Sequence, residues 1–343
     1  MTNIAQTWRR TLGSLAAIAG LLVSGLCAAQ ESSASSMPLI DVHFHLMPFM
    51  RPETLEARMD KNHVALAISA GAIGGPQIGD PRVRDADVTL RLADRYIPAS
   101  GSGELYRAER AAGVNLFTDA ANPYRTDALA RLLDQRYSGR RAIPETFPNA
   151  ENSSVDPMRR RRVPTDGPFF QELMKLAVQE KLPLPMHMEW HPESVAQLAN
   201  LLRAFPEGTV VLSHCGKITV ADDIRLFFEQ HTNVYCDLGF RGAPLASQES
   251  LKDPKRLIYW PSGLFRKADI KPDWLKLIND FPERFMMAID DVHSWEQYDE
   301  VVAAIRDGVL AKLDPVVAEQ VAYRNALKVY RLPNDTVRPR PQN

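Results

Sequence analysis

Short apolar runs alternate with longer amphipathic segments along most of this chain. The apolar runs have the length and composition of buried strands, and they lie at residues 39–46, 64–69, 97–100, 141–147, 183–188, 209–214, 233–238 and 284–290. The segments between them show the apolar spacing of helices, at residues 51–60, 82–96, 104–112, 126–137, 168–181, 192–205, 222–230, 273–281, 296–307 and 315–330. Pro144 makes the fourth strand the least regular, because proline interrupts the hydrogen bonding of a central strand.

Strand and helix alternate about eight times, which indicates parallel strands joined by helical crossovers. Eight such units in 343 residues favour a closed barrel over an open sheet. A glycine-rich phosphate loop does not follow the first strand, so a dinucleotide-binding sheet loses its main support. We therefore predict an α/β protein with a single (β/α)8 TIM-barrel domain at residues 38–332.

The first strand alternates apolar and polar residues, so Asp41, His43 and His45 should share one face. Two imidazoles two residues apart can hold one metal ion, with Asp41 a layer below as a hydrogen-bond acceptor. Taken alone, the segment fits a surface strand that carries two histidines equally well.

Three other predicted strands also end in a histidine or an aspartate. His187 closes the fifth strand, His214 the sixth and Asp290 the eighth. Parallel barrel strands bring their carboxyl ends to one rim, so these side chains should meet there. Each buried polar end needs a partner, and one divalent ion satisfies several at once. The pattern therefore predicts a metal site at the C-terminal rim.

The composition is that of an ordinary globular protein, with 45% hydrophobic residues, a formal net charge of −1 and a pI near 6.7. This argues against a nucleic-acid-binding or a disordered protein. The main basic run, at residues 159–162, fits either a solvated loop or a lid that attracts carboxylate substrates.

The first 29 residues form a segment of a different kind. Arg9 and Arg10 precede an apolar run that ends in small residues, which is typical of a secretory signal cleaved after Ala29. The run is too short and too rich in glycine for a stable membrane span. The arginine pair leaves the twin-arginine route open beside the general one. We expect an exported, periplasmic protein with a linker at residues 30–37 and a loose tail at residues 333–343.

Cysteine is scarce once the signal is removed. Cys27, which would otherwise be a lipidation candidate, leaves with the signal, and Cys215 and Cys236 remain. Two cysteines make no disulfide framework, so we expect the core to hold the fold. Cys215 has the opposite parity to His214 and should pack under a helix instead of binding metal.

The sequence Asp-Val-His-Phe-His at residues 41–45, with the later strand-end histidines and aspartate, resembles the metal-dependent amidohydrolase superfamily. More narrowly it is similar to the mononuclear branch, which includes decarboxylases of carboxymuconate semialdehyde and of hydroxybenzoates, together with lactone hydrolases. Residues 320–327 are similar to the Asn-Ala-bearing helix that ends that branch. The resemblance covers nearly all of the mature chain and is loosest at residues 101–164.

The resemblance implies one divalent ion, zinc before manganese or iron(II), bound by His43, His45, His187 and Asp290. His214 would lie beside the activated water or the polarised substrate oxygen. Asp290 would accept the proton of the water, although Asp291 directly follows and competes for that assignment.

Four further residues are candidates around this site. Glu145 stands on the fourth strand, where the binuclear branch has a modified lysine. It would bridge a second metal, pair with an arginine of the basic run, or lie in solvent at the rim. Lys217 and Arg241 follow the sixth and seventh strands, where cations bind a substrate carboxylate, and His293 would line the pocket.

The resemblance implies a metal-dependent hydrolase that uses an activated water on a small carboxylated or cyclic amide, ester or lactone. A non-oxidative decarboxylase of an aromatic or unsaturated carboxylic acid would need nearly the same residues. A non-catalytic metal- or ligand-binding barrel is the alternative of another class. We expect a small-molecule substrate, no nucleic acid, no membrane span after signal cleavage, and either a monomer or a homodimer.

Overall fold

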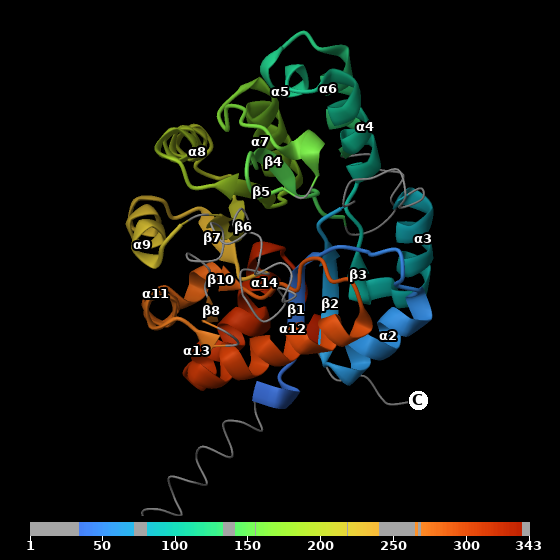
Figure 1. Cartoon of the computed structure of the whole chain (residues 1–343), viewed down its shortest axis with the longest axis vertical. Coiled ribbons are helices and arrows are strands. Elements are labelled where there is room, and N and C mark those ends of the chain that lie inside the picture. The colour runs from blue at the N-terminus through green and yellow to red at the C-terminus, as the bar shows by residue number, and fades with distance from the viewer. Residues whose placement is uncertain are drawn as a thin grey trace, which may run out of the picture.

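Parallel strands form two sheets in the computed structural model, which describes residues 34–71, 81–132, 141–154, 156–217, 219–239, 265–266 and 269–337 (Figure 1). One sheet has the order β1-β2-β3 and the other the order β10-β7-β6-β5-β4. Their strands are β1 (Leu39–Phe44), β2 (Val64–Ser69), β3 (Tyr96–Ile97), β4 (Thr146–Asn149), β5 (Leu184–Glu189), β6 (Val210–Lys217), β7 (Val234–Asp237) and β10 (Phe285–Met286). A separate antiparallel pair consists of β8 (Phe265–Arg266) and β9 (Asp269–Ile270).

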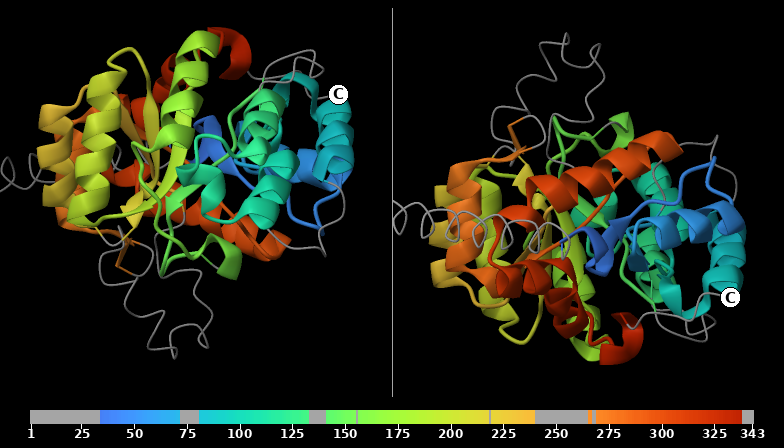
Figure 2. Two further views of the ribbon diagram at one scale, coloured as in Figure 1. Left: turned by 90° about the horizontal axis from the view of Figure 1, so that it is seen from above. Right: turned by 90° about the horizontal axis from the view of Figure 1, so that it is seen from below.

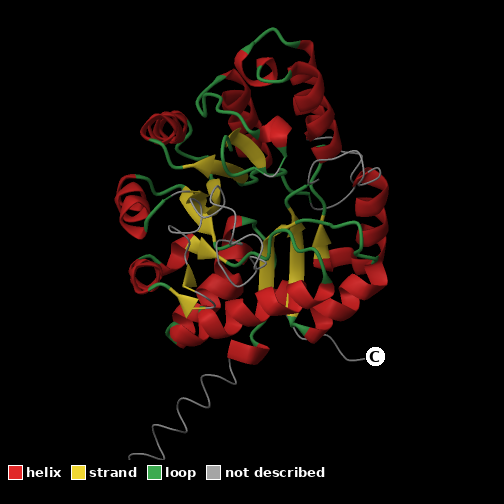
Figure 3. Ribbon diagram, viewed as in Figure 1, coloured by secondary structure: helices red, strands yellow, loops and turns green. Residues whose placement is uncertain are grey.

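The two sheets are joined at both edges. Phe44 at the end of β1 pairs in parallel with Asp290 after β10, and Ala99 after β3 pairs in parallel with Ala142 before β4. At the first seam, the backbone N–H of Asp290 donates to the carbonyl of His43 over 2.8 Å. The strands of the described residues therefore close into the predicted eight-stranded parallel barrel, with helices outside it (Figure 3).

The helices surround the strands in both views of Figure 2. They are α2 (Pro52–Lys61), α3 (Pro81–Leu92), α4 (Ser102–Ala112), α5 (Asn115–Thr118), α6 (Pro123–Leu132), α7 (Pro168–Glu180), α8 (Pro192–Ala204), α9 (Ala221–Gln230), α11 (Pro272–Asp280), α12 (Trp295–Gly308), α13 (Pro315–Glu319) and α14 (Asn325–Val329). Most of them begin with proline, which suits the first helical position because it needs no backbone N–H there.

Several predicted elements differ from the structure; the eighth strand, for example, is regular only at Phe285–Met286. The fourth strand begins at Thr146, not at residue 141, because Pro144 has no N–H to donate. The closing helix is interrupted by a π-helical turn, η7 (Gln320–Arg324), between α13 and α14. Just beyond that turn, the Asn325 amide donates to the carbonyls of Pro282 and Phe285, which ties α14 to the start of β10.

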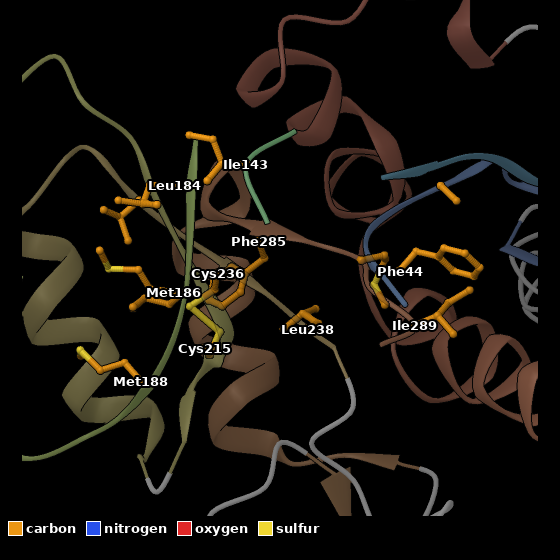
Figure 4. Close-up of a cluster of buried hydrophobic side chains, with 14 of the residues drawn as sticks. Phe44, Ile143, Leu184, Met186, Met188, Cys215, Cys236, Leu238, Phe285 and Ile289 are labelled. Atoms are coloured by element: carbon orange, nitrogen blue, oxygen red, sulfur yellow. A yellow bond between two sulfur atoms is a disulfide. The ribbon is translucent and has the colours of Figure 1, made fainter. Parts of the chain in front are cut away.

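Apolar side chains fill two separate cores. The larger one lies between strands and helices and includes Phe44, Met186 and Phe285 (Figure 4). The smaller one includes Ile40 and Met286 from the strands, closed by residues of the C-terminal segment. Together they hold the carboxyl ends of the strands in fixed relative positions.

A disulfide between Cys215 and Cys236 links β6 to β7 inside the larger core (Figure 4). Cys215 directly follows His214, and Cys236 directly precedes Asp237; both neighbours belong to the site described below. The sequence predicted a buried Cys215 but not its partner, because pairing depends on how two strands lie side by side.

The described residues include no helix long and apolar enough to cross a membrane. The predicted signal at residues 1–29 and residues 338–343 of the predicted tail lie outside the described residues. The proposed domain limits therefore stay a prediction.

Candidate metal centre

Six of the predicted side chains meet at the carboxyl ends of the barrel strands. They are His43, His45, Glu145, His187, His214 and Asp290, and each is between 1% and 6% exposed. They come from β1 and the residue directly after it, the segment before β4, β5, β6 and the segment after β10, so the barrel brings together residues that are far apart in the sequence.

One group of donor atoms surrounds the first histidine pair. The Nε2 atoms of His43 and His45 are 3.1 Å apart. Asp290 Oδ1 lies 3.6 Å and 3.5 Å from these two nitrogens, and Glu145 Oε2 lies 3.4 Å and 3.6 Å from them. Such separations suit ligands of a single ion with bonds of about 2.1 Å. The donor set therefore fits a divalent metal.

A second group lies on the other side of Glu145. Glu145 Oε1 is 3.2 Å from His187 Nδ1 and 3.7 Å from His214 Nε2. Glu145 thus directs one oxygen to each histidine pair. The prediction of a solvent-exposed Glu145 is wrong, and so is its pairing with the basic run, because the buried arginines of that run bind Glu109 instead.

Each of the four histidines turns its other ring nitrogen to an outer partner. These pairs are His43 Nδ1 with Asp237 Oδ2 at 2.9 Å, His45 Nδ1 with the Gly71 carbonyl at 3.0 Å, His214 Nδ1 with the Gly239 carbonyl at 3.2 Å, and His187 Nε2 with Ser153 Oγ at 2.8 Å. Outer partners of this kind orient metal ligands and select their tautomer.

Asp237 and Ser153 are residues of this site that were not predicted from the sequence, and Asp237 makes more contacts. Its Oδ2 binds His43, while its Oδ1 accepts the backbone N–H groups of His214 and Gly239, each over 2.9 Å. The available signal was its place at the end of the seventh strand, where the other strands carry site residues. Asp41 is a hydrogen-bond acceptor below the site, as predicted, and it accepts the backbone N–H groups of His43 and Ile289.

The backbone at two site residues is strained. His214 has a φ of 58° and Asp290 a φ of 70°, in the left-handed region that side chains disfavour. Such residues cost on the order of 1–3 kcal/mol each and persist where their surroundings hold them, often at functional sites. Here the bonds from His214 to Asp237 and from Asp290 to His43 hold both segments.

Charges within the cluster shift its pKa values strongly. Burial would lower the pKa of His43, but Glu145, Asp237 and Asp290 outweigh it and hold that pKa well above its usual value. Burial would raise the pKa of Glu145, but His43 and the other histidines hold it well below its usual value. Burial raises the pKa of Asp290 to about 7.

Two histidines are kept neutral, as metal ligands must be. Burial lowers the pKa of His187. Burial, followed by the positive charge of Lys217, holds the pKa of His214 well below its usual value. Lys217 therefore acts electrostatically on the site from the end of β6.

Of the remaining candidates, His293 lies apart from the cluster. The side chain of His293 is 70% exposed and faces Asp291, 3.8 Å away. Asp291 donates its backbone N–H to Asp290 Oδ1, so Asp290 is the aspartate within reach of the histidines. Arg241 lies outside the described residues.

The basic run at residues 159–162 is only half solvated, so the solvated-loop prediction is wrong for two of its arginines. Arg159 and Arg161 are buried and bind the two carboxylate oxygens of Glu109 at 3.1 Å and 3.0 Å. Arg159 also stacks over Phe147, 4.1 Å from its centroid. The run therefore anchors the segment after β4 to α4.

Comparisons with known proteins show which family and which proteins this chain is similar to. A model of the family described as Amidohydrolase matches residues 40–332. Among curated proteins, adenine deaminase of Geobacillus kaustophilus is 28% identical over 175 residues, which are 49% of this chain and only 28% of that protein.

Solved structures are also similar at low identity. The 2,6-dihydroxybenzoate decarboxylase from Rhizobium is 11% identical, with 86% of this chain and 99% of that chain covered and a TM-score of 0.47. Dihydroorotase from Campylobacter jejuni is 12% identical, with 88% of this chain and 86% of that chain covered and a TM-score of 0.48.

Proposed function

The chain belongs to the amidohydrolase family of metal-dependent enzymes, and on this premise we propose that it hydrolyses a small carboxylated or cyclic amide, ester or lactone. One observation carries the proposal. His43, His45 and Asp290 converge with Glu145 on one buried point at the C-terminal rim of the barrel. Zinc suits this nitrogen and oxygen donor set, with manganese or iron(II) as alternatives.

The position of Glu145 supports a second ion beside the one that the sequence predicted. Its Oε2 faces His43 and His45, and its Oε1 faces His187 and His214. Since the Gly239 carbonyl only accepts hydrogen bonds, the hydrogen of His214 belongs on Nδ1, and its Nε2 carries a free lone pair toward Glu145. His214 is therefore better suited to bind an ion than to donate to an oxyanion.

A divalent ion held by His43, His45 and Asp290 would lower the pKa of water to about 7 and would polarise a substrate oxygen. Asp290, a buried carboxyl within reach of the histidines, accepts the proton of the attacking water and passes it to the leaving group. Asp237 keeps His43 in one tautomer, and Lys217 supplies positive charge near a carboxylated substrate. The buried cluster keeps bulk water from competing.

Export is also part of the proposal. Disulfides persist mainly in oxidising compartments, so the Cys215–Cys236 bond supports delivery to the periplasm through the signal predicted at residues 1–29. Fractionation of cells with N-terminal sequencing of the recovered protein tests this; a mature chain that begins near residue 30 is expected.

The activity itself is tested with a panel of amides, esters, lactones and carboxylated phenols. Acid release and CO2 release are followed separately on the zinc-loaded protein. Acid release that is lost after chelation and restored by zinc supports the proposal. CO2 release without acid release would assign the decarboxylase instead, and tight metal binding without turnover on the whole panel would assign a binding barrel.

A further inference from the structure

The outer partner of His187 differs in kind from those of the other three histidines. Asp237 and the Gly71 and Gly239 carbonyls only accept hydrogen bonds, so they fix one tautomer permanently. Ser153 binds His187 Nε2 through a hydroxyl, which can donate or accept. The orientation of His187 therefore depends on where Ser153 is held and on which role its hydroxyl takes.

A buried carboxylate holds Ser153 in place. Glu189, at the end of β5, is 0% exposed. Its Oε1 accepts the backbone N–H groups of Asn152 and Ser153 at 2.6 Å and 2.7 Å, and its Oε2 accepts the Asn152 side-chain amide at 3.0 Å. His191 Nε2 also lies 3.3 Å from Oε2. Three hydrogen bonds from two adjacent residues thus fix the loop that carries the hydroxyl.

The geometry of His187 shows what this arrangement can do. Its Nδ1 points to Glu145 Oε1, 3.2 Å away, on the metal side. For Nδ1 to bind an ion, the ring hydrogen must sit on Nε2, and the atom next to Nε2 must accept it. Ser153 Oγ is that atom, at 2.8 Å. When Nδ1 is protonated and donates to Glu145, the same hydroxyl can turn and donate to Nε2.

We propose that Ser153 is the positioning residue of His187, whose hydroxyl holds the metal-binding tautomer, and that Glu189 acts through Ser153 by fixing its loop. This inference rests on the metal centre of the proposed function. It assigns a role to two residues that touch no reacting atom. It predicts that the affinity for an ion bound by His187 depends on the loop that carries Ser153.

The test measures zinc affinity by competition with a chromogenic chelator on purified full-length mature protein. Ser153→Ala should weaken the ion bound by His187 about 10- to 100-fold, as loss of an outer partner usually does. Ser153→Thr keeps the hydroxyl and should restore most of the affinity. Ser154→Ala is the matched control, because that neighbouring hydroxyl binds the backbone of Asp156 and should leave affinity unchanged.

Glu189→Gln tests the second half of the proposal. Alone it should weaken zinc binding, and Ser153→Ala with Glu189→Gln together should bind no more weakly than Ser153→Ala alone, since both act through one contact. Additive losses would overturn the assignment of Glu189. The melting temperature of each metal-free variant is measured as well, and an affinity loss matched by an equal loss of metal-free stability would overturn the positioning role.

The outcomes separate this inference from the proposed function. If the wild-type protein binds zinc tightly and Ser153→Ala binds it equally well, the role of Ser153 is wrong while the metal centre stands. If the wild-type protein binds no divalent ion, the proposed function fails, and this inference fails with it.

Discussion

At the scale of single residues, the site depends on hydrogen bonds that surround the ligands as much as on the ligands. Asp237 links His43 to the strained backbone at His214 through its two oxygens. The Asp290 segment is held by a backbone bond to the His43 carbonyl and by the bond from the Ile289 N–H to Asp41. A small change in these supports should therefore move a ligand without unfolding the barrel.

Asp290→Asn is the sharpest test at this scale. An amide cannot accept the proton of the attacking water, so kcat should fall by about 100-fold or more, which is the range for loss of a general base. The fold should persist, because the backbone bond from residue 290 to His43 remains. Steady-state kinetics and circular dichroism of the variant check both points.

Asp291→Asn is its control. The backbone N–H of Asp291 donates to Asp290 Oδ1, while the Asp291 side chain lies 3.8 Å from the exposed His293. The Asp291 carboxylate is therefore outside the donor cluster. Activity should stay close to that of the wild type. Loss of turnover in Asp291→Asn with retention in Asp290→Asn would reverse the assignment of the two aspartates.

At the scale of elements, the segment after β4 is held by buried ion pairs in addition to a short 3-10 turn (Pro157–Arg159) and an antiparallel bridge between Asn149 and Arg162. Glu109 of α4 binds Arg159 and Arg161, and all three side chains are buried. This anchoring lies close to Ser153, which reaches the metal centre. The segment is therefore a rigid part of the barrel rim in the structure.

Glu109→Ala should destabilise the protein strongly. It leaves two buried guanidinium groups without their carboxylate, and loss of one partner of a buried pair costs about 3–5 kcal/mol. Urea unfolding followed by circular dichroism measures the difference. Glu151→Ala removes the exposed pair with Arg162 on the same segment and should cost at most about 1 kcal/mol; equal costs would contradict the anchoring role.

The disulfide between β6 and β7 gives a second prediction for elements. Cys215→Ala with Cys236→Ala opens a covalent loop with a sequence separation of 21 residues, which should lower the free energy of unfolding by about 3 kcal/mol. Thermal unfolding compares this variant with the wild type in oxidised and reduced form. Reduced wild type should approach the variant, and no difference between the two wild-type forms would contradict a stabilising bond.

At the scale of the whole molecule, much of this structure could be predicted from sequence. The eight strands and most helices could be predicted from local apolar spacing. His43, His187 and Asp290 could be predicted as site residues because they lie at or near the ends of predicted strands. Contacts between distant segments could not be predicted in this way. The roles of Asp237 and Ser153 depend on which strand or loop packs beside which histidine, and periodicity along one strand carries no such information.

Metal removal tests the centre as a whole. The carboxyl groups of Glu145 and Asp290 lie 3.4–3.6 Å from the same two atoms, His43 Nε2 and His45 Nε2, so a bound cation would offset their close approach. A metal that binds only the folded state stabilises it, by about 3–4 kcal/mol at 100 to 1,000 times its dissociation constant. Chelation should therefore lower the melting temperature in calorimetry, and added zinc should restore it. An unchanged melting temperature after verified metal loss would contradict this.

The seam between β1 and β10 has a consequence for how the molecule is made. His43 and His45 leave the ribosome early, whereas Asp290 emerges only when most of the chain has been synthesised. The bond from the Asp290 N–H to the His43 carbonyl forms after that point. A truncated or stalled chain therefore lacks a complete set of ligands, and metal capture marks a barrel whose first and last strands have met.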